Sequence, residues 1–134
     1  MVDVSPGLFL LNMAPYIVST TILAAAAVIS FWLSRQRQSR GLFLIALGFL
    51  INLIIDGSWD LYYWLALGGP FQALVLYQRG LSVAQIGATI ALTGLVGEAI
   101  GTVAYVSMLG LIIYGALQIT QEHADNKVVS SVPV

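Results

Sequence analysis

The sequence contains no cysteine and very few charged side chains. Only 8% of its residues are charged and 59% are hydrophobic, whereas ordinary soluble domains contain about 25% charged residues. The absence of cysteine excludes disulfide frameworks, thiolate metal sites and cysteine nucleophiles. The scarcity of charge is atypical of a water-soluble monomer. It predicts that the chain buries its surface in lipid, in copies of itself, or in both.

Recognisable catalytic motifs are also absent. The sequence has no phosphate-binding glycine loop, nucleophile elbow or HExxH motif. The single histidine, His123, follows Glu122 in a polar segment, where we expect it to be solvated. The first residues carry no basic side chain before the apolar run, which fits a signal peptide poorly. We therefore predict no enzymatic activity, no metal site and no cofactor.

Long uncharged runs are the main feature that is present. They cover residues 4–34, 41–55, 61–78, 80–97 and 99–121. Several match or exceed the roughly 18–20 residues of a membrane-spanning helix. We predict an all-α fold in which hydrophobic helical hairpins form a bundle of about four helices over residues 1–120. A polar C-terminal tail over 121–134 follows, and we expect it to be disordered unless a neighbour holds it.

Helix boundaries are predicted from local signals. The expected helices cover about 8–33, 42–67, 71–79 and 82–120. Pro15 either kinks the first helix or marks its first turn, and Gly41 serves as a C-terminal stop or a hinge. Ser82 and Gln85 form a capping box for the last helix. As one rod that helix would be about 58 Å long, so a break near Gly94–Gly101 is as plausible as a single helix.

Glycines recur every seventh residue near the start of the last helix. They are Gly80, Gly87, Gly94 and Gly101, and Gly97 adds a small-xxx-small pair with Gly101. We call these five residues the glycine stripe. Glycine costs about 0.5–1 kcal/mol relative to alanine inside a helix, so the pattern requires compensation. Small residues let two helix backbones approach closely in apolar surroundings, and the stripe therefore predicts a helix-packing interface. The alternative is that glycine is simply common in membrane helices.

Three carboxylates interrupt the apolar runs. Asp56 and Asp60 lie four residues apart among aromatic side chains, which is typical of a membrane-interface belt at a helix break or boundary. A shared proton or a bound cation is the alternative. Glu98 lies beside the glycine stripe. It is expected at a helix end or paired, and an ion site is the alternative.

Three of the four arginines occur within the segment SRQRQSR at residues 34–40, which we call the arginine turn. Arg35, Arg37 and Arg40 suit contacts with phosphate oxygens, whereas the absence of aromatics argues against base stacking. The turn therefore predicts non-sequence-specific DNA contact. A solvated loop, or the cytoplasmic loop of a membrane protein, is the alternative.

The chain resembles the major capsid proteins of tailed spindle-shaped archaeal viruses. The resemblance lies in ILAAAAVISFW, GLFLIALGFLINLII, the glycine-rich helix and VSMLGLIIYGALQ, with little charge outside SRQRQSR and the tail. It implies a short all-helical viral protein that enters the host cell membrane before assembly. Many copies then form a shell around DNA through apolar helix contacts, and the tail grips a neighbour.

Two other classes remain open. A small polytopic membrane protein, such as an accessory subunit of a respiratory or transport complex, fits the lengths of the uncharged runs. An ion-translocating ring subunit would use Glu98. A coat protein would persist as a particle after detergent treatment, whereas a membrane subunit would leave with the detergent in a complex of defined stoichiometry.

Overall fold

The computed structural model describes residues 6–130, and every regular element in this range is helical. The elements are α1 (Pro6–Arg37), α2 (Arg40–Ala66), the 3-10 helix η1 (Gly69–Phe71), α3 (Gln72–Gln78) and α4 (Val83–Ser130). The all-α fold of packed hydrophobic helices is confirmed. The helix starts and ends agree with the sequence to within a few residues, except at the end of α4.

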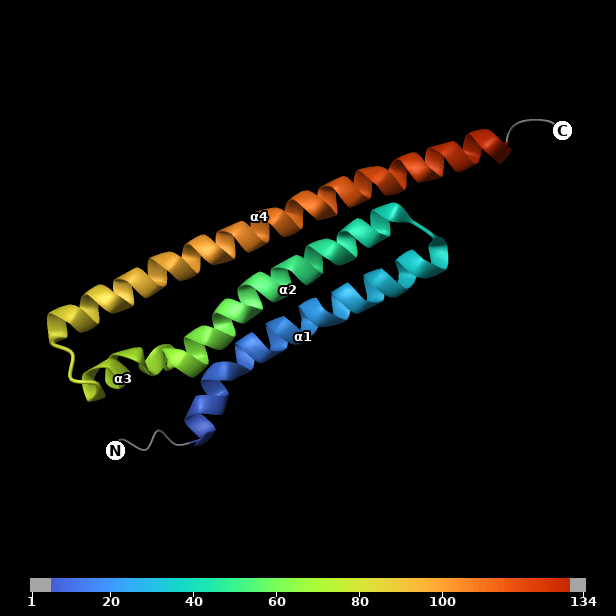
Figure 1. The fold of residues 1–134 in the computed structure, drawn as a ribbon. Helices are drawn as coiled ribbons and strands as arrows, with labels where there is room; N and C mark the ends of the chain where they lie inside the picture. Colours follow the sequence, from blue (N-terminus) through green and yellow to red (C-terminus); the bar gives the residue numbers. More distant parts are fainter. Residues whose placement is uncertain (1–5, 131–134) are drawn as a thin grey trace.

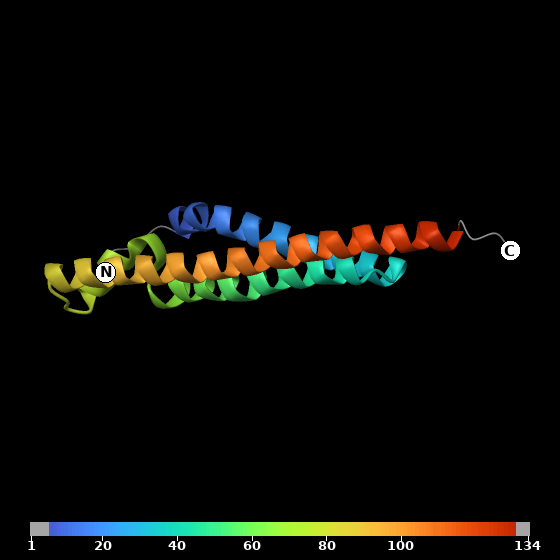
Figure 2. The same ribbon diagram turned by 90° about the horizontal axis from the view of Figure 1, so that it is seen from above.

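The three long helices lie side by side, with α2 between α1 and α4 (Figure 1). No further layer of helices covers them when they are viewed from above (Figure 2). Each of the three is long and apolar enough to cross a membrane. Only five hydrophobic residues in the described range are buried: Ala27, Ala46, Trp64, Leu76 and Ala104. A single copy therefore leaves most of its apolar surface uncovered.

The turn between α1 and α2 places a left-handed residue at Gln38, whose φ is +49°. The backbone N–H of Ser39 donates to the carbonyl of Ser34 at 3.2 Å, which is the bond that closes a helix C-terminus of this kind. Ser39 then caps α2 by accepting a hydrogen bond from the N–H of Leu42. Gly41 lies inside α2 and is buried. The prediction that Gly41 is a stop or a hinge is wrong because the reversal occurs at Gln38.

Other local signals act as predicted. Gly68 and Gly69 adopt positive φ after the end of α2, where the Gly-Gly-Pro sequence predicted a break. The capping box at the start of α4 is present: the N–H of Ser82 donates to Oε1 of Gln85 at 2.9 Å, and the N–H of Gln85 donates to Oγ of Ser82 at 3.4 Å. Pro15 lies within α1 without ending it. The first turns of α1 bend away from the rest of the helix (Figure 1).

The last helix is single and longer than expected. Its 48 residues correspond to about 72 Å. No break occurs near Gly94–Gly101, and α4 continues through the polar residues 121–130. The expectation that this polar segment is disordered is wrong for these residues. No proline and, after Gly115, no glycine interrupts the helix, and Lys127 in the last turn is favourable beside the helix dipole. Residues 131–134 lie outside the described range.

Glycines allow α2 and α4 to approach each other closely. A Cβ added at Gly115 would lie 2.6 Å from the carbonyl oxygen of Gly41, and one added at Gly41 would overlap the carbonyl of Gly115. Further along, a Cβ at Gly48 would lie 3.1 Å from the carbonyl of Met108. Close backbone approach increases dispersion contacts where apolar burial against lipid gains nothing. The contact between α2 and α4 therefore depends on the absence of side chains at these positions.

The substitution Gly115→Ala tests this contact. The added methyl cannot be accommodated without moving α2, so we expect the protein in detergent to lose about 1–3 kcal/mol of unfolding free energy. Gly110→Ala is the matched control on the same helix, because a Cβ there meets nothing within 4 Å. It should stabilise α4 by up to about 1 kcal/mol. Denaturant titration followed by circular dichroism measures both, and equal effects would contradict the interpretation.

Candidate functional site

The arginine turn lies at one end of the helix array. Arg35 and Arg37 are in the last turn of α1, Arg40 begins α2, and all three side chains are exposed. The structure therefore brings the three predicted phosphate-binding residues to one end of the molecule. Of the three, Arg35 lies over an aromatic ring. The distance from its guanidinium carbon to the ring centroid of Phe31 is 5.5 Å.

Glu122 of α4 binds the start of α2 beside the arginine turn. Its Oε2 accepts a hydrogen bond from Oγ of Ser39 at 2.6 Å. Its Oε1 accepts from the backbone N–H of Arg40 at 2.9 Å and from that of Gly41 at 3.4 Å. The first N–H groups of a helix have no partner within the helix and attract negative charge. Glu122 thus acts as a capping carboxylate supplied by a different helix.

These contacts change the acidity of Glu122, which lies beyond the apolar run that ends at Gln121. The hydrogen bond from Ser39 lowers the pKa of Glu122 most, and the bonds from Gly41 and Arg40 act in the same direction. All of them favour the charged carboxylate. The sequence places Glu122 in the polar C-terminal tail and predicts no partner for it in the same chain. No local pattern could have identified its role, because its partners lie more than 80 residues away.

The glycine stripe divides into two parts. A Cβ at Gly97 would lie 2.8 Å from Nε1 of Trp59, and one at Gly101 would lie 3.6 Å from Oδ1 of Asp56. This part of the stripe faces α2. At Gly87 and Gly94 an added Cβ would meet nothing within 4 Å, and Gly80 precedes α4 with a φ of +82°. Gly87 therefore has no packing partner in the described range of one chain, whereas Gly94 borders a cavity that Asp56, Asp60 and Glu98 also line.

The closest glycine contacts were missed in the sequence. Gly41 and Gly48 are seven residues apart on α2, and Gly115 lies fourteen residues after Gly101 on α4. The sevenfold spacing that identified the stripe thus also marks the tightest part of the contact between the two helices. Met108 occupies the position midway between Gly101 and Gly115. The sevenfold glycine repeat therefore did not point to Gly115.

The three carboxylates come together away from the arginine turn. Asp56 and Asp60 from α2 and Glu98 from α4 line one cavity of about 400 Å³, together with Thr93 and Tyr16. Within residues 6–130 no group of three histidine or carboxylate side chains is placed to hold a metal ion. The cavity is therefore polar and acidic, and it lies between otherwise apolar helices.

The helix break and the helix end expected at these carboxylates are absent. Asp56 and Asp60 do not mark a helix break, because α2 is continuous from Arg40 to Ala66. Glu98 is not at a helix end, because α4 continues on both sides of it. Trp59 of α2 packs against Gly97 of α4 within this polar segment. α2 remains helical through the segment. His123, in contrast, is exposed as predicted.

Comparisons with protein families, with curated proteins and with solved structures find no match for this chain.

The lowered pKa of Glu122 predicts a pH dependence. A carboxylate with a lowered pKa stabilises the fold fully above the ordinary glutamate pKa, and this stabilisation is lost as the pH falls through the lowered value. We expect Glu122→Gln to reduce the thermal midpoint in detergent near neutral pH and to flatten its decline in acid. Asp125→Asn, an exposed change three residues away, should keep the decline. Thermal scans across the acidic range measure it, and an unchanged profile in Glu122→Gln would refute the role.

Proposed function

We propose that this chain is a viral structural protein, the major capsid subunit of a helical or spindle-shaped shell around DNA. Many copies assemble through apolar helix-helix contacts. The protein enters the host cell membrane before assembly and ends in the virion. The proposal assigns it no catalytic role and no cofactor, and it follows the resemblance to capsid proteins of tailed spindle-shaped archaeal viruses.

The length of apolar helix in α4 carries the proposal. Residues 83–121 form a continuous helical stretch whose single charged side chain is Glu98. This stretch is about 58 Å long, whereas the hydrocarbon core of a bilayer is about 30 Å thick. Even at a tilt of about 40°, the upper end of the usual range, it spans about 44 Å. Lipid alone therefore leaves apolar helix uncovered, and contacts with further copies would cover it.

The exposed surface is also suited to self-association. Large apolar side chains are exposed on each long helix, for example Leu11 at 72%, Leu65 at 72% and Leu95 at 66%. Apolar patches of this extent mark interaction surfaces. Gly87 leaves room beside the backbone of α4, whereas Gly94 borders the acidic cavity of its own chain. A surface without large side chains lets a neighbouring helix pack at more than one register, because none of them locks the contact.

A small polytopic membrane subunit is the second candidate. It is favoured by the three helices that are long enough to cross a membrane and by the acidic cavity of Asp56, Asp60 and Glu98. In that case the protein would leave the membrane with detergent as a complex of fixed stoichiometry. In an ion-translocating ring, Glu98→Gln would abolish function, whereas in a coat it would leave assembly nearly unchanged. Electron microscopy of purified material separates a filament or spindle from an isolated complex.

Substitutions in the open part of the glycine stripe test self-assembly. Gly87→Leu and Gly94→Leu should keep the helix content of single copies, because an added Cβ meets nothing within 4 Å at either site, and the leucine side chain at position 94 would extend beside the acidic cavity. They should block particles by separating neighbouring helices. Gly110→Leu is the matched control, since it lies off the stripe and also has open space. Particle yield is counted by electron microscopy, and normal particles from the first two variants would count against the interface.

Substitutions in the arginine turn test the DNA contact. Replacing Arg35, Arg37 and Arg40 by Gln should weaken DNA retention equally for different sequences. It should also reduce the slope of log affinity against log salt by up to about 2.7, since each phosphate contact contributes about 0.9. Nuclease protection of DNA in assembled particles, measured over a salt series, gives both quantities. An unchanged slope would exclude the arginine turn from the DNA interface.

A further inference from the structure

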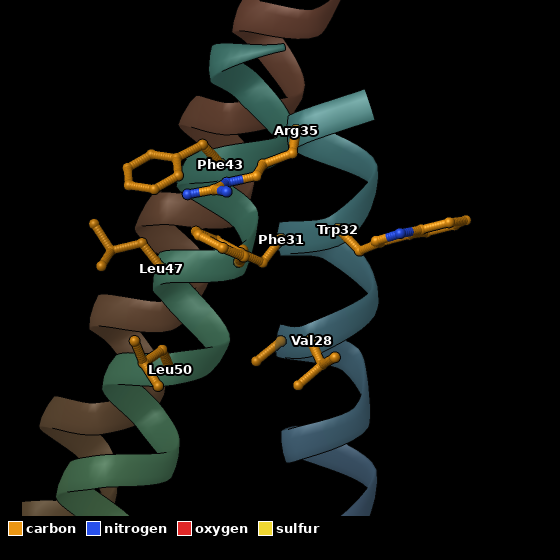
Figure 3. A pocket seen from close by; sticks show the side chains of 9 residues that line it. Val28, Phe31, Trp32, Arg35, Phe43, Leu47 and Leu50 are labelled. Carbon is orange, nitrogen blue, oxygen red and sulfur yellow. The ribbon is translucent and has the colours of Figure 1, made fainter. Parts of the chain in front are cut away.

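An apolar groove lies between α1 and α2 next to the arginine turn. Its volume is about 690 Å³, and its walls include Ala27, Phe31, Ala46 and Leu50. Arg35 is the only charged side chain among the residues that line it. Figure 3 shows the side chain of Arg35 extending across the end of the groove above Phe31 and close to Phe43. The groove is therefore apolar along its length and cationic at one end.

The sequence explains this shape. Ala27 and Ala46 are buried and provide no bulk at the base of the groove. Phe31 and Phe43 stand at the end next to the turn, with ring centroids 6.1 Å apart and ring planes at 50°. The Arg35 guanidinium lies over Phe31, an arrangement favoured by the negative face of the ring. The position of the cation is thus set by the wall of the groove itself.

The shape and lining of the groove suit an acyl chain. Along α1 it extends from Ala27 to Arg35, which is about 12 Å of helix rise. A single acyl chain can lie along this length against the apolar side chains that line the groove. An acyl chain alone, however, leaves the Arg35 guanidinium without an anionic partner.

We propose that this groove binds an acyl chain of an anionic phospholipid and that Arg35 binds the phosphate of its headgroup. A guanidinium matches the geometry of phosphate oxygens and is more weakly hydrated than an ammonium group. Arg35 lies at the level of the turn, where a headgroup would lie when its chain follows α1 toward Ala27. The inference rests on the proposed function only in that the chain meets a membrane before assembly.

Native mass spectrometry of the full chain in mild detergent tests the proposal. The probes are phosphatidylglycerol and phosphatidylcholine with identical acyl chains, added in equal amounts. The unmodified chain should retain the anionic lipid about fivefold more than the zwitterionic one. Arg35→Gln should bring this ratio to about one. Val28→Trp, which adds bulk to an exposed wall position of the groove, should reduce retention of both lipids. Lys127→Gln, at the same end of the molecule but outside the groove, should keep the preference.

Several outcomes would overturn the proposal. They are equal retention of both lipids by the unmodified chain, an unchanged preference in Arg35→Gln, or retention unaffected by Val28→Trp. Displacement of phosphatidylglycerol by inorganic phosphate at equal concentration would indicate a free-anion site and would also overturn it. Circular dichroism of each variant verifies folding. Particle formation is scored separately: particles without lipid preference refute the lipid site alone, and lipid preference without particles refutes the capsid function alone.

Discussion

The close contact between α2 and α4 is the interaction on which the rest of the structure depends. α2 is the only long helix that packs extensively on both others, so its position determines where α1 lies. Gly41, Gly48 and Gly115 let the two backbones meet without intervening side chains. Glu122 holds the same end by binding the free N–H groups of α2. The contact between α2 and α4 is thus stabilised by dispersion at close range and by the Glu122 cap. Few buried hydrophobic side chains contribute to it.

Because charged groups are scarce, the exposed surfaces of the long helices are largely apolar. A soluble bundle of this size would turn its apolar faces inward, whereas here large apolar side chains are exposed on α1, α2 and α4. Most ionisable groups of the described residues lie at the arginine turn, around the acidic cavity and in the polar end of α4 at residues 122–127. Apolar helix surface between these two regions is available for lipid or for other copies, and the excess length of α4 favours copies over lipid alone.

The sequence predicted the elements better than their contacts. Long apolar runs, the Ser82–Gln85 capping box and the Gly-Gly-Pro break gave the helices because these signals act within a few residues. The contacts of Glu122 and Gly115 were missed because they join positions far apart in the chain. Within the glycine stripe, Gly97 and Gly101 face α2. Gly87 has no packing partner among the described residues, and the role of the stripe in assembly remains a prediction.

The uninterrupted length of α4 has a mechanical consequence. An α-helix curves only gently, with a radius of about 60–100 Å, and within α4 no proline provides a flexible joint. In the shell that we propose, walls made of such stiff helices would acquire their curvature through small changes in the angle and offset between adjacent subunits. A wide spindle and a narrow tube would then differ only in how neighbouring subunits are stacked.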